Sequence, residues 1–165
     1  MKETPRIVLA LFPNARGMGY ACMDVIERQI VDYGVFNSRP LRNAIVLRRI
    51  NSLIEYHNPS ILLLRNYQGT SAQNKTRLKN LNIEISGIAD KKNTSVYSYS
   101  RKQMRDVFEQ FGASSKEAVA NQLIVWFEEL LPLKPRKRKD WMDEDYHMGV
   151  FDALALIITH QYLAT

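Results

Sequence analysis

The sequence has little cysteine, no long apolar run and no glycine-rich phosphate loop. Its one cysteine, Cys22, excludes a disulfide within the chain and a zinc site built from several cysteines. No segment approaches the roughly 18 consecutive apolar residues of a membrane span, and the apolar stretch near the N-terminus is too short for a signal peptide. We therefore expect a cytoplasmic location. Nucleotide hydrolysis and acyl transfer have little support, because Ser-His-Asp spacing and Cys-His pairs are also missing.

Positive charge is what the sequence has in excess. The 165 residues carry a formal net charge of +6 and are 45% hydrophobic, as expected for one globular domain over residues 1–165. The charge is clustered: four arginines fall within residues 39–49, and Lys or Arg fills five of the six positions 134–139. Such clustering favours a polyanion as partner, although it also serves solubility.

The order of predicted elements indicates an α/β protein. Residues 7–12, 17–24 and 30–36 are typical of three strands in an antiparallel meander, and the unbroken apolar run 60–64 predicts a strand buried on both faces. Residues 71–91 fit a helix better than a strand, and a further strand is expected at 95–100. Helices are predicted from Ser38 to Asn58, after Ser100, from Ser114 to Pro132, and from residues 143–146 to the C-terminus. Together these elements predict a mixed five-stranded sheet with helices on both faces.

Three stretches carry a resemblance to a known family. "IVLALFPNARGMGYA" (7–21), "SSKEAVANQLI" (114–124) and "FDALALIITH" (151–160) resemble segments of the RuvC family of bacterial Holliday-junction resolvases, which have a ribonuclease-H-like fold. The resemblance runs in order over nearly the whole chain. It implies a homodimer that binds branched DNA such as four-way junctions and cuts phosphodiester bonds with two Mg²⁺ ions.

The acids that this family uses are mostly missing at the matching positions. The resemblance places them at the end of strand one, at the end of strand four, and at two positions one turn apart on the last helix. This sequence has Phe12, Arg65, Gly149 and Asp152 there. Two Mg²⁺ ions need several carboxylate ligands, so the resemblance predicts a DNA-binding protein with an eroded nuclease centre and no cofactor.

Two alternatives remain open at this point. Asp152, Asp145 and Asp24 are candidates for a rearranged acidic site, which would make the chain an active Mg²⁺-dependent endonuclease. In the simpler interpretation, Asp152 pairs with Arg65. The second alternative is a non-catalytic scaffold that uses this fold to hold a protein partner.

The candidates for phosphate contacts come from three stretches. Arg101, Lys102 and Arg105 lie at a predicted helix start, where backbone N–H groups also favour anions. The other candidates are Arg65 and the basic loop, with Lys134, Arg136, Lys137, Arg138 and Lys139. The loop has the alternative of being merely solvated. If the chain is a homodimer, the helix within residues 74–91 is the expected interface.

Overall fold

The sheet has the predicted mixed, five-stranded architecture. The computed structural model describes residues 6–67, 75–137, 145 and 147–164. The strands are β1 (Ile7–Pro13), β2 (Gly17–Asp24), β3 (Gln29–Asn37), β4 (Ile61–Arg65) and β5 (Ser95–Tyr99), in the spatial order β3-β2-β1-β4-β5. β2 pairs antiparallel with β1 and β3, whereas β4 pairs in parallel with both β1 and β5. The strand predicted at 60–64 is confirmed as an interior strand, with its bounds one residue later at Ile61–Arg65, and β1 is the middle one.

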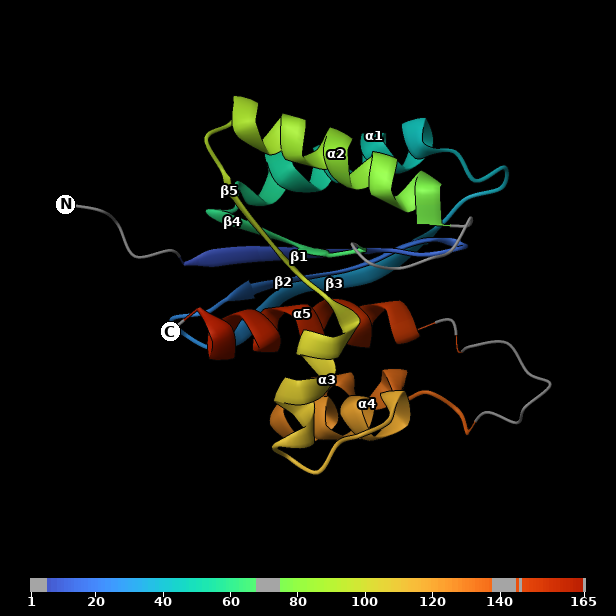
Figure 1. Cartoon of the computed structure of the whole chain (residues 1–165). Coiled ribbons are helices and arrows are strands. Elements are labelled where there is room, and N and C mark those ends of the chain that lie inside the picture. The colour runs from blue at the N-terminus through green and yellow to red at the C-terminus, as the bar shows by residue number, and fades with distance from the viewer. Residues whose placement is uncertain (1–5, 68–74, 138–144, 146, 165) are drawn as a thin grey trace.

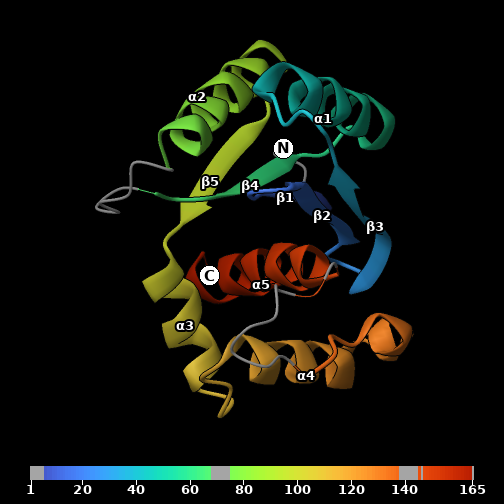
Figure 2. The same cartoon turned by 90° about the vertical axis from the view of Figure 1, so that its right-hand side faces the viewer.

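Helices cover both faces of the sheet, also as predicted (Figures 1 and 2). α1 (Asn43–His57) and α2 (Thr76–Lys91) lie on one face. α5 (Met148–Leu163) lies on the other, and α3 (Arg101–Glu109) and α4 (Lys116–Trp126) pack outside it. Of the described helices, none is long and apolar enough to cross a membrane.

Alternation along β1 connects the sheet to both helical layers. Leu9 and Leu11 join the core beneath α1 and α2, whereas Val8, Ala10 and Phe12 join the core around α5. Successive side chains of a strand point to opposite faces, so a middle strand with both faces covered is apolar throughout. Phe12, the last of these side chains, consequently lies on the α5 side where the strand ends.

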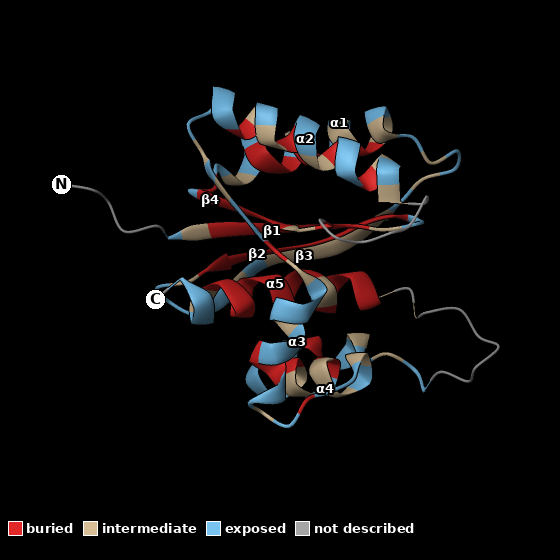
Figure 3. Cartoon of the chain, viewed as in Figure 1, coloured by how far each residue is buried: buried red, intermediate tan, exposed pale blue. Residues whose placement is uncertain are grey.

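α5 is enclosed between the sheet and the outer helices (Figure 3). Every residue from Met148 to His160 is buried except Asp152. A helix that is apolar on all sides must be covered on all sides, which explains the additional layer of α3 and α4. The helix starts close to β2: a Cβ added to Gly149 would lie 3.0 Å from the Cα of Gly19. The one partly exposed residue in this stretch, Asp152, is thus held on a rigid element.

Several predicted helix boundaries were wrong. α1 was predicted to start after a cap at Ser38, but it begins at Asn43. Ser38 caps no helix and instead donates its hydroxyl hydrogen to the Pro40 carbonyl (3.0 Å). At α4 the cap is Ser115, whose hydroxyl accepts the Ala118 N–H, so the predicted cap at Ser114 was one residue early.

The ends of the last two predicted helices also needed correction. α4 stops at Trp126, and a 3-10 helix, η2 (Glu128–Leu133), follows with Pro132 inside it. α5 begins at Met148, later than the predicted start within 143–146; of that stretch the structure describes Asp145, which is not helical. The helical prediction for 71–91 was right over Thr76–Lys91, and residues 71–74 lie outside the described part.

Candidate nucleic-acid interface

An open cleft of about 700 Å³ lies at the edge of the sheet where β1 and β4 end. The two strands are parallel, so their carboxyl ends meet at one edge, and the start of α5 crosses there. All four positions matched by the resemblance, Phe12, Arg65, Gly149 and Asp152, line this cleft. The family resemblance therefore predicted correctly that the ends of β1 and β4 and the start of α5 lie together.

Cations dominate the described lining of the cleft. Among the residues that the structure describes, two carboxylates, Asp145 and Asp152, and six cations line it. The cations are Arg16, Arg65, Lys75, Arg77, Arg101 and Lys116. We call the site lined by these eight residues the cationic cleft. An excess of fixed positive charge in a concave surface attracts anions and raises their local concentration.

The pKa of Lys75 reports this excess of charge. Partial burial lowers the pKa of its ammonium group, and repulsion from Arg65, Arg101 and Lys116 lowers it further. Like charges held close together disfavour each other's charged state, and a bound anion would relieve that repulsion. The cationic cleft is thus electrostatically complementary to a phosphate chain.

Arg65 lies at the end of β4, where its guanidinium packs against two aromatic rings. Its guanidinium carbon lies 4.7 Å from the ring centre of Tyr67 and 5.8 Å from that of Phe12. The Asn82 side-chain amide donates to the Arg65 carbonyl at 2.8 Å, which anchors the backbone. Within the described structure, the Nε atom of Arg65 is buried and has no hydrogen-bond partner. A buried donor without a partner is costly, and an anionic oxygen would satisfy it.

The turn between β1 and β2 is held in place from two sides. Its own Asn14 side chain accepts the Arg16 N–H at 2.9 Å. Arg77 donates to the Asn14 carbonyl at 2.8 Å, and the Tyr67 hydroxyl donates to the Pro13 carbonyl at 3.2 Å. This bracing places the turn, and Arg16 with it, at the rim of the cationic cleft.

Both carboxylates of the cleft lie beside cationic groups. Asp152 lies 3.9 Å from the Lys116 ammonium, and its side chain is 15% exposed. Asp145 accepts the backbone N–H groups of His147 (2.9 Å) and Arg136 (3.1 Å). Burial opposes ionisation of Asp145, but these donors outweigh it and lower its pKa. Neighbouring protein groups thus favour the charged form of Asp145.

The matched positions do not fit a centre of two Mg²⁺ ions. Phe12, Arg65 and Gly149 carry no carboxylate, so one of the four positions supplies an acidic ligand, where two ions need several. Gly149 also has little room for a side chain beside Gly19. In the part of the chain that the structure describes, no three His, Cys, Asp or Glu residues are grouped closely enough to hold a metal ion.

The prediction of Asp24 as a substitute metal ligand in this cleft was wrong. Asp24 pairs in register with Ile7 at one end of β1, whereas Phe12 pairs with Gly19 near the other end. Its carboxylate instead accepts from the Arg6 guanidinium at 2.6 Å. Among the residues that the structure describes, the acids that line this cleft and could serve a rearranged site are Asp145 and Asp152.

The candidates for phosphate contacts divide according to position. Arg101 lines the cationic cleft, and Arg105 lines a smaller pocket beside it. Lys102 faces solvent and pairs with Asp106 at 2.9 Å. The predicted helix start thus contributes to the cleft through its first residue, Arg101.

The basic loop is described only in part. Arg136 reaches the cleft indirectly, because its Nε lies 3.9 Å from the Asp145 carboxylate. Lys134 and Lys137 are exposed after η2 and are not among the residues that line the cleft. Arg138 and Lys139 lie outside the described residues.

Sequence reasoning missed four cations of the cleft. These are Arg16, Lys75, Arg77 and Lys116. Lys116 lies in a stretch that carried the family resemblance, and Arg77 lies in the first turn of α2. No local pattern distinguishes such residues from ordinary surface charges, because it is the tertiary fold that brings them together.

Comparison with known proteins supports the resemblance to the RuvC family. No family model matches the chain. Over 171 aligned residues it is 25% identical to the crossover junction endodeoxyribonuclease RuvC of Cytophaga hutchinsonii, which covers 98% of this chain and 78% of that protein. Among solved structures, Thermus thermophilus RuvC superposes with a TM-score of 0.64 at 19% identity, covering 96% and 95% of the two chains. The yeast mitochondrial Holliday junction resolvase Ydc2 gives 0.65 at 17%, covering 96% and 78%.

The fold defines a class. A mixed five-stranded sheet with helices on both faces, in this strand order, is the ribonuclease-H-like arrangement. Within that class the chain is RuvC-like, in sequence along nearly its whole length and in structure. The family resemblance inferred from the three sequence stretches is confirmed.

Proposed function

We propose that this chain binds branched or double-stranded DNA by holding phosphates in the cationic cleft. The observation that carries the proposal is the set of six cations, which outnumber the two carboxylates among the described residues of the cleft. The relatives add support, since one solved Thermus thermophilus RuvC structure is a complex with a Holliday junction substrate. Contacts to phosphates supply much of the affinity for DNA and make it dependent on salt.

We further propose that Arg65 takes the place of a metal ion. The guanidinium lies at the matched position of a metal-binding acid, is fixed against Tyr67 and Phe12, and has its Nε free to donate. A fixed cation there repels divalent ions and attracts a phosphate oxygen. The nuclease centre is then eroded, and the cleft holds a phosphodiester without cutting it.

A binding series tests the first proposal. A labelled four-way junction and a linear duplex of equal length are titrated with the protein between 50 and about 200 mM salt, the range over which phosphate-dominated binding weakens steeply. We expect binding at low salt to both, with a steep loss as salt rises. The absence of binding to either DNA at the lowest salt would contradict the proposal and favour the protein-interaction scaffold.

One observation favours a second candidate, an active Mg²⁺-dependent junction endonuclease. Asp145 and Asp152 both line the cleft, with side chains 14% and 15% exposed. The test is incubation of a labelled junction with Mg²⁺ or Mn²⁺, for the wild type and for Asp152→Asn. Under the eroded-centre proposal neither protein cuts. Cleavage by the wild type that disappears in Asp152→Asn would establish the alternative.

The family resemblance also leads us to propose a homodimer. The predicted reason for placing α2 at its interface needs correction, because the apolar side of α2 packs within the chain through Leu81, Ile85 and Ala89. On its outer side Ile83 is 69% exposed. Light scattering at tens of micromolar protein tests the dimer: twice the 19.1 kDa chain mass is expected, and the monomer mass would count against it.

A further inference from the structure

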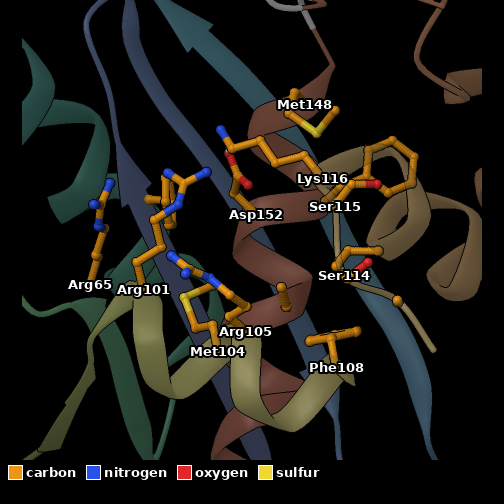
Figure 4. Close-up of a pocket in the computed structure, with 15 residues that line it drawn as sticks. Arg65, Arg101, Met104, Arg105, Phe108, Ser114, Ser115, Lys116, Met148 and Asp152 are labelled. Carbon is orange, nitrogen blue, oxygen red and sulfur yellow. Dashed lines mark ion pairs between the residues drawn. The ribbon is translucent and has the colours of Figure 1, made fainter. Parts of the chain in front are cut away.

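A second, smaller pocket of about 100 Å³ opens beside the cationic cleft (Figure 4). It lies between α3, α4 and α5, and its apolar lining includes Met104, Phe108, Val119 and Phe151. Four cations line it as well: Arg65, Arg101, Arg105 and Lys116. Arg65, Arg101 and Lys116 also line the cationic cleft, so the two sites are continuous.

The composition of this pocket selects a mixed ligand. An apolar interior favours a group that water solvates poorly, whereas the surrounding cations favour an attached anion. A volume of about 100 Å³ exceeds the space that one water needs and is smaller than the roughly 150 Å³ of an apolar cavity that encloses benzene, so the pocket has room for part of a single ring and none for a fused pair. The ligand that fits is a single flat ring carried on an anionic chain.

The pocket also has polar lining groups, which could contact the edge of a ring whose face lies against the apolar side chains. The Ser115 hydroxyl and the Asp152 carboxylate offer acceptors, and Arg101 and Lys116 offer donors (Figure 4). Bases present both donors and acceptors on their edges, so they match this mixture better than a purely apolar ring does.

We propose that the pocket binds an unpaired pyrimidine base of DNA whose flanking phosphates lie in the cationic cleft. The inference rests on the proposed DNA binding and adds a specificity to it. A paired base is kept inside the stack, whereas a base at a bulge or branch is released at little cost. The pocket therefore gives the protein a preference for DNA with unpaired pyrimidines.

The test compares two duplexes with the same number of phosphates. One carries a single-thymine bulge and the other carries an abasic residue at the same place. We expect the wild type to bind the thymine bulge about tenfold more tightly, since stacking of one base on a protein is worth about that factor. Val119→Trp fills the pocket and should abolish this ratio while it preserves affinity for the abasic duplex.

A matched control lies on the same helix. Val125 is 71% exposed on α4, so Val125→Trp adds the same volume outside the pocket and should keep the ratio. Met104→Trp, on α3, fills the pocket from its other wall and decides the matter if Val119→Trp does not fold. Equal affinity of the wild type for the two bulged duplexes would overturn this inference and leave the proposed DNA binding intact. A tenfold ratio that survives in the folded, filled variants would also overturn it, and failure to bind either duplex would overturn both proposals.

Discussion

Two neighbouring cations on α3 give a sharp test of the cationic cleft. Arg101 and Lys102 are adjacent in sequence and carry the same charge, but Arg101 lines the cleft, whereas Lys102 pairs with Asp106 on an exposed surface. Neither residue supplies the helix cap, which Ser100 forms with Gln103. We expect Arg101→Gln to weaken DNA binding and Lys102→Gln to leave it nearly unchanged.

The size of the effect follows from counterion release. Each phosphate contact contributes about 0.9 to the slope of log K against log salt, so the loss of one contact lowers that slope by about 0.9. Between 1 M and 0.1 M salt this corresponds to about 0.9 log units, or about eightfold in affinity at 0.1 M. Lys102→Gln removes the same net charge, so a general charge effect would change both variants equally.

The assay is fluorescence anisotropy of a labelled four-way junction at several salt concentrations. The wild type, Arg101→Gln and Lys102→Gln are compared after thermal melts have shown that all three are folded. Equal losses in the two variants would show that DNA binding depends on overall charge and would refute the assignment of the cleft. A larger loss for Lys102→Gln would place the DNA on the outer face of α3.

Three further predictions concern the fold that positions the cleft. Gly19→Ala should destabilise the protein by about 3 kcal/mol in urea unfolding, because its Cβ would lie 2.2 Å from the Gly149 backbone. Gly87→Ala should stabilise α2 by about 0.8 kcal/mol, because its Cβ would meet nothing within 4 Å. Equal effects of the two substitutions would contradict the packing described. Burial raises the pKa of the Cys22 thiol to about 12, so a thiol reagent at pH 8 should modify it only after unfolding, and rapid reaction of the folded protein would be inconsistent with that burial. Burial opposes ionisation of Asp24, but the Glu27 N–H and the Arg6 guanidinium outweigh it and lower its pKa. The stability that Asp24→Asn removes should therefore be fully present above about pH 4 and should vanish as the pH falls further, whereas a pH-independent difference in chemical unfolding would contradict the pairing.

The sequence predicted the fold well where one pattern excluded the others. The unbroken apolar run 60–64 fits a strand covered on both faces, and β4 is such a strand. Ser100 and Gln103 predicted the start of α3, and both halves of the capping box form. Helix boundaries failed where local signals competed: Ser114 and Ser115 are equally good caps, and the choice between them depends on tertiary packing.

The site was predictable at the level of strand ends and unpredictable at the level of surface cations. The ends of β1 and β4 meet because the strands are parallel, which places Phe12 and Arg65 together. The same reasoning applied to antiparallel β2 places Asp24 at the opposite edge, where the structure has it. Lys75 and Lys116, by contrast, come from helix starts far apart in sequence, and no local pattern links them.

In the proposed function, Arg65 supplies the positive charge that metal ions would provide in an intact nuclease centre of this family. The most direct measurement is the affinity for a four-way junction in EDTA and in millimolar Mg²⁺, at constant ionic strength, for the wild type and Arg65→Gln. We expect tight binding by the wild type without divalent ions, no gain on adding Mg²⁺, and weaker binding by a folded Arg65→Gln protein. Binding by the wild type that requires Mg²⁺, or an Arg65→Gln variant that binds as tightly as the wild type in EDTA, would contradict this proposal.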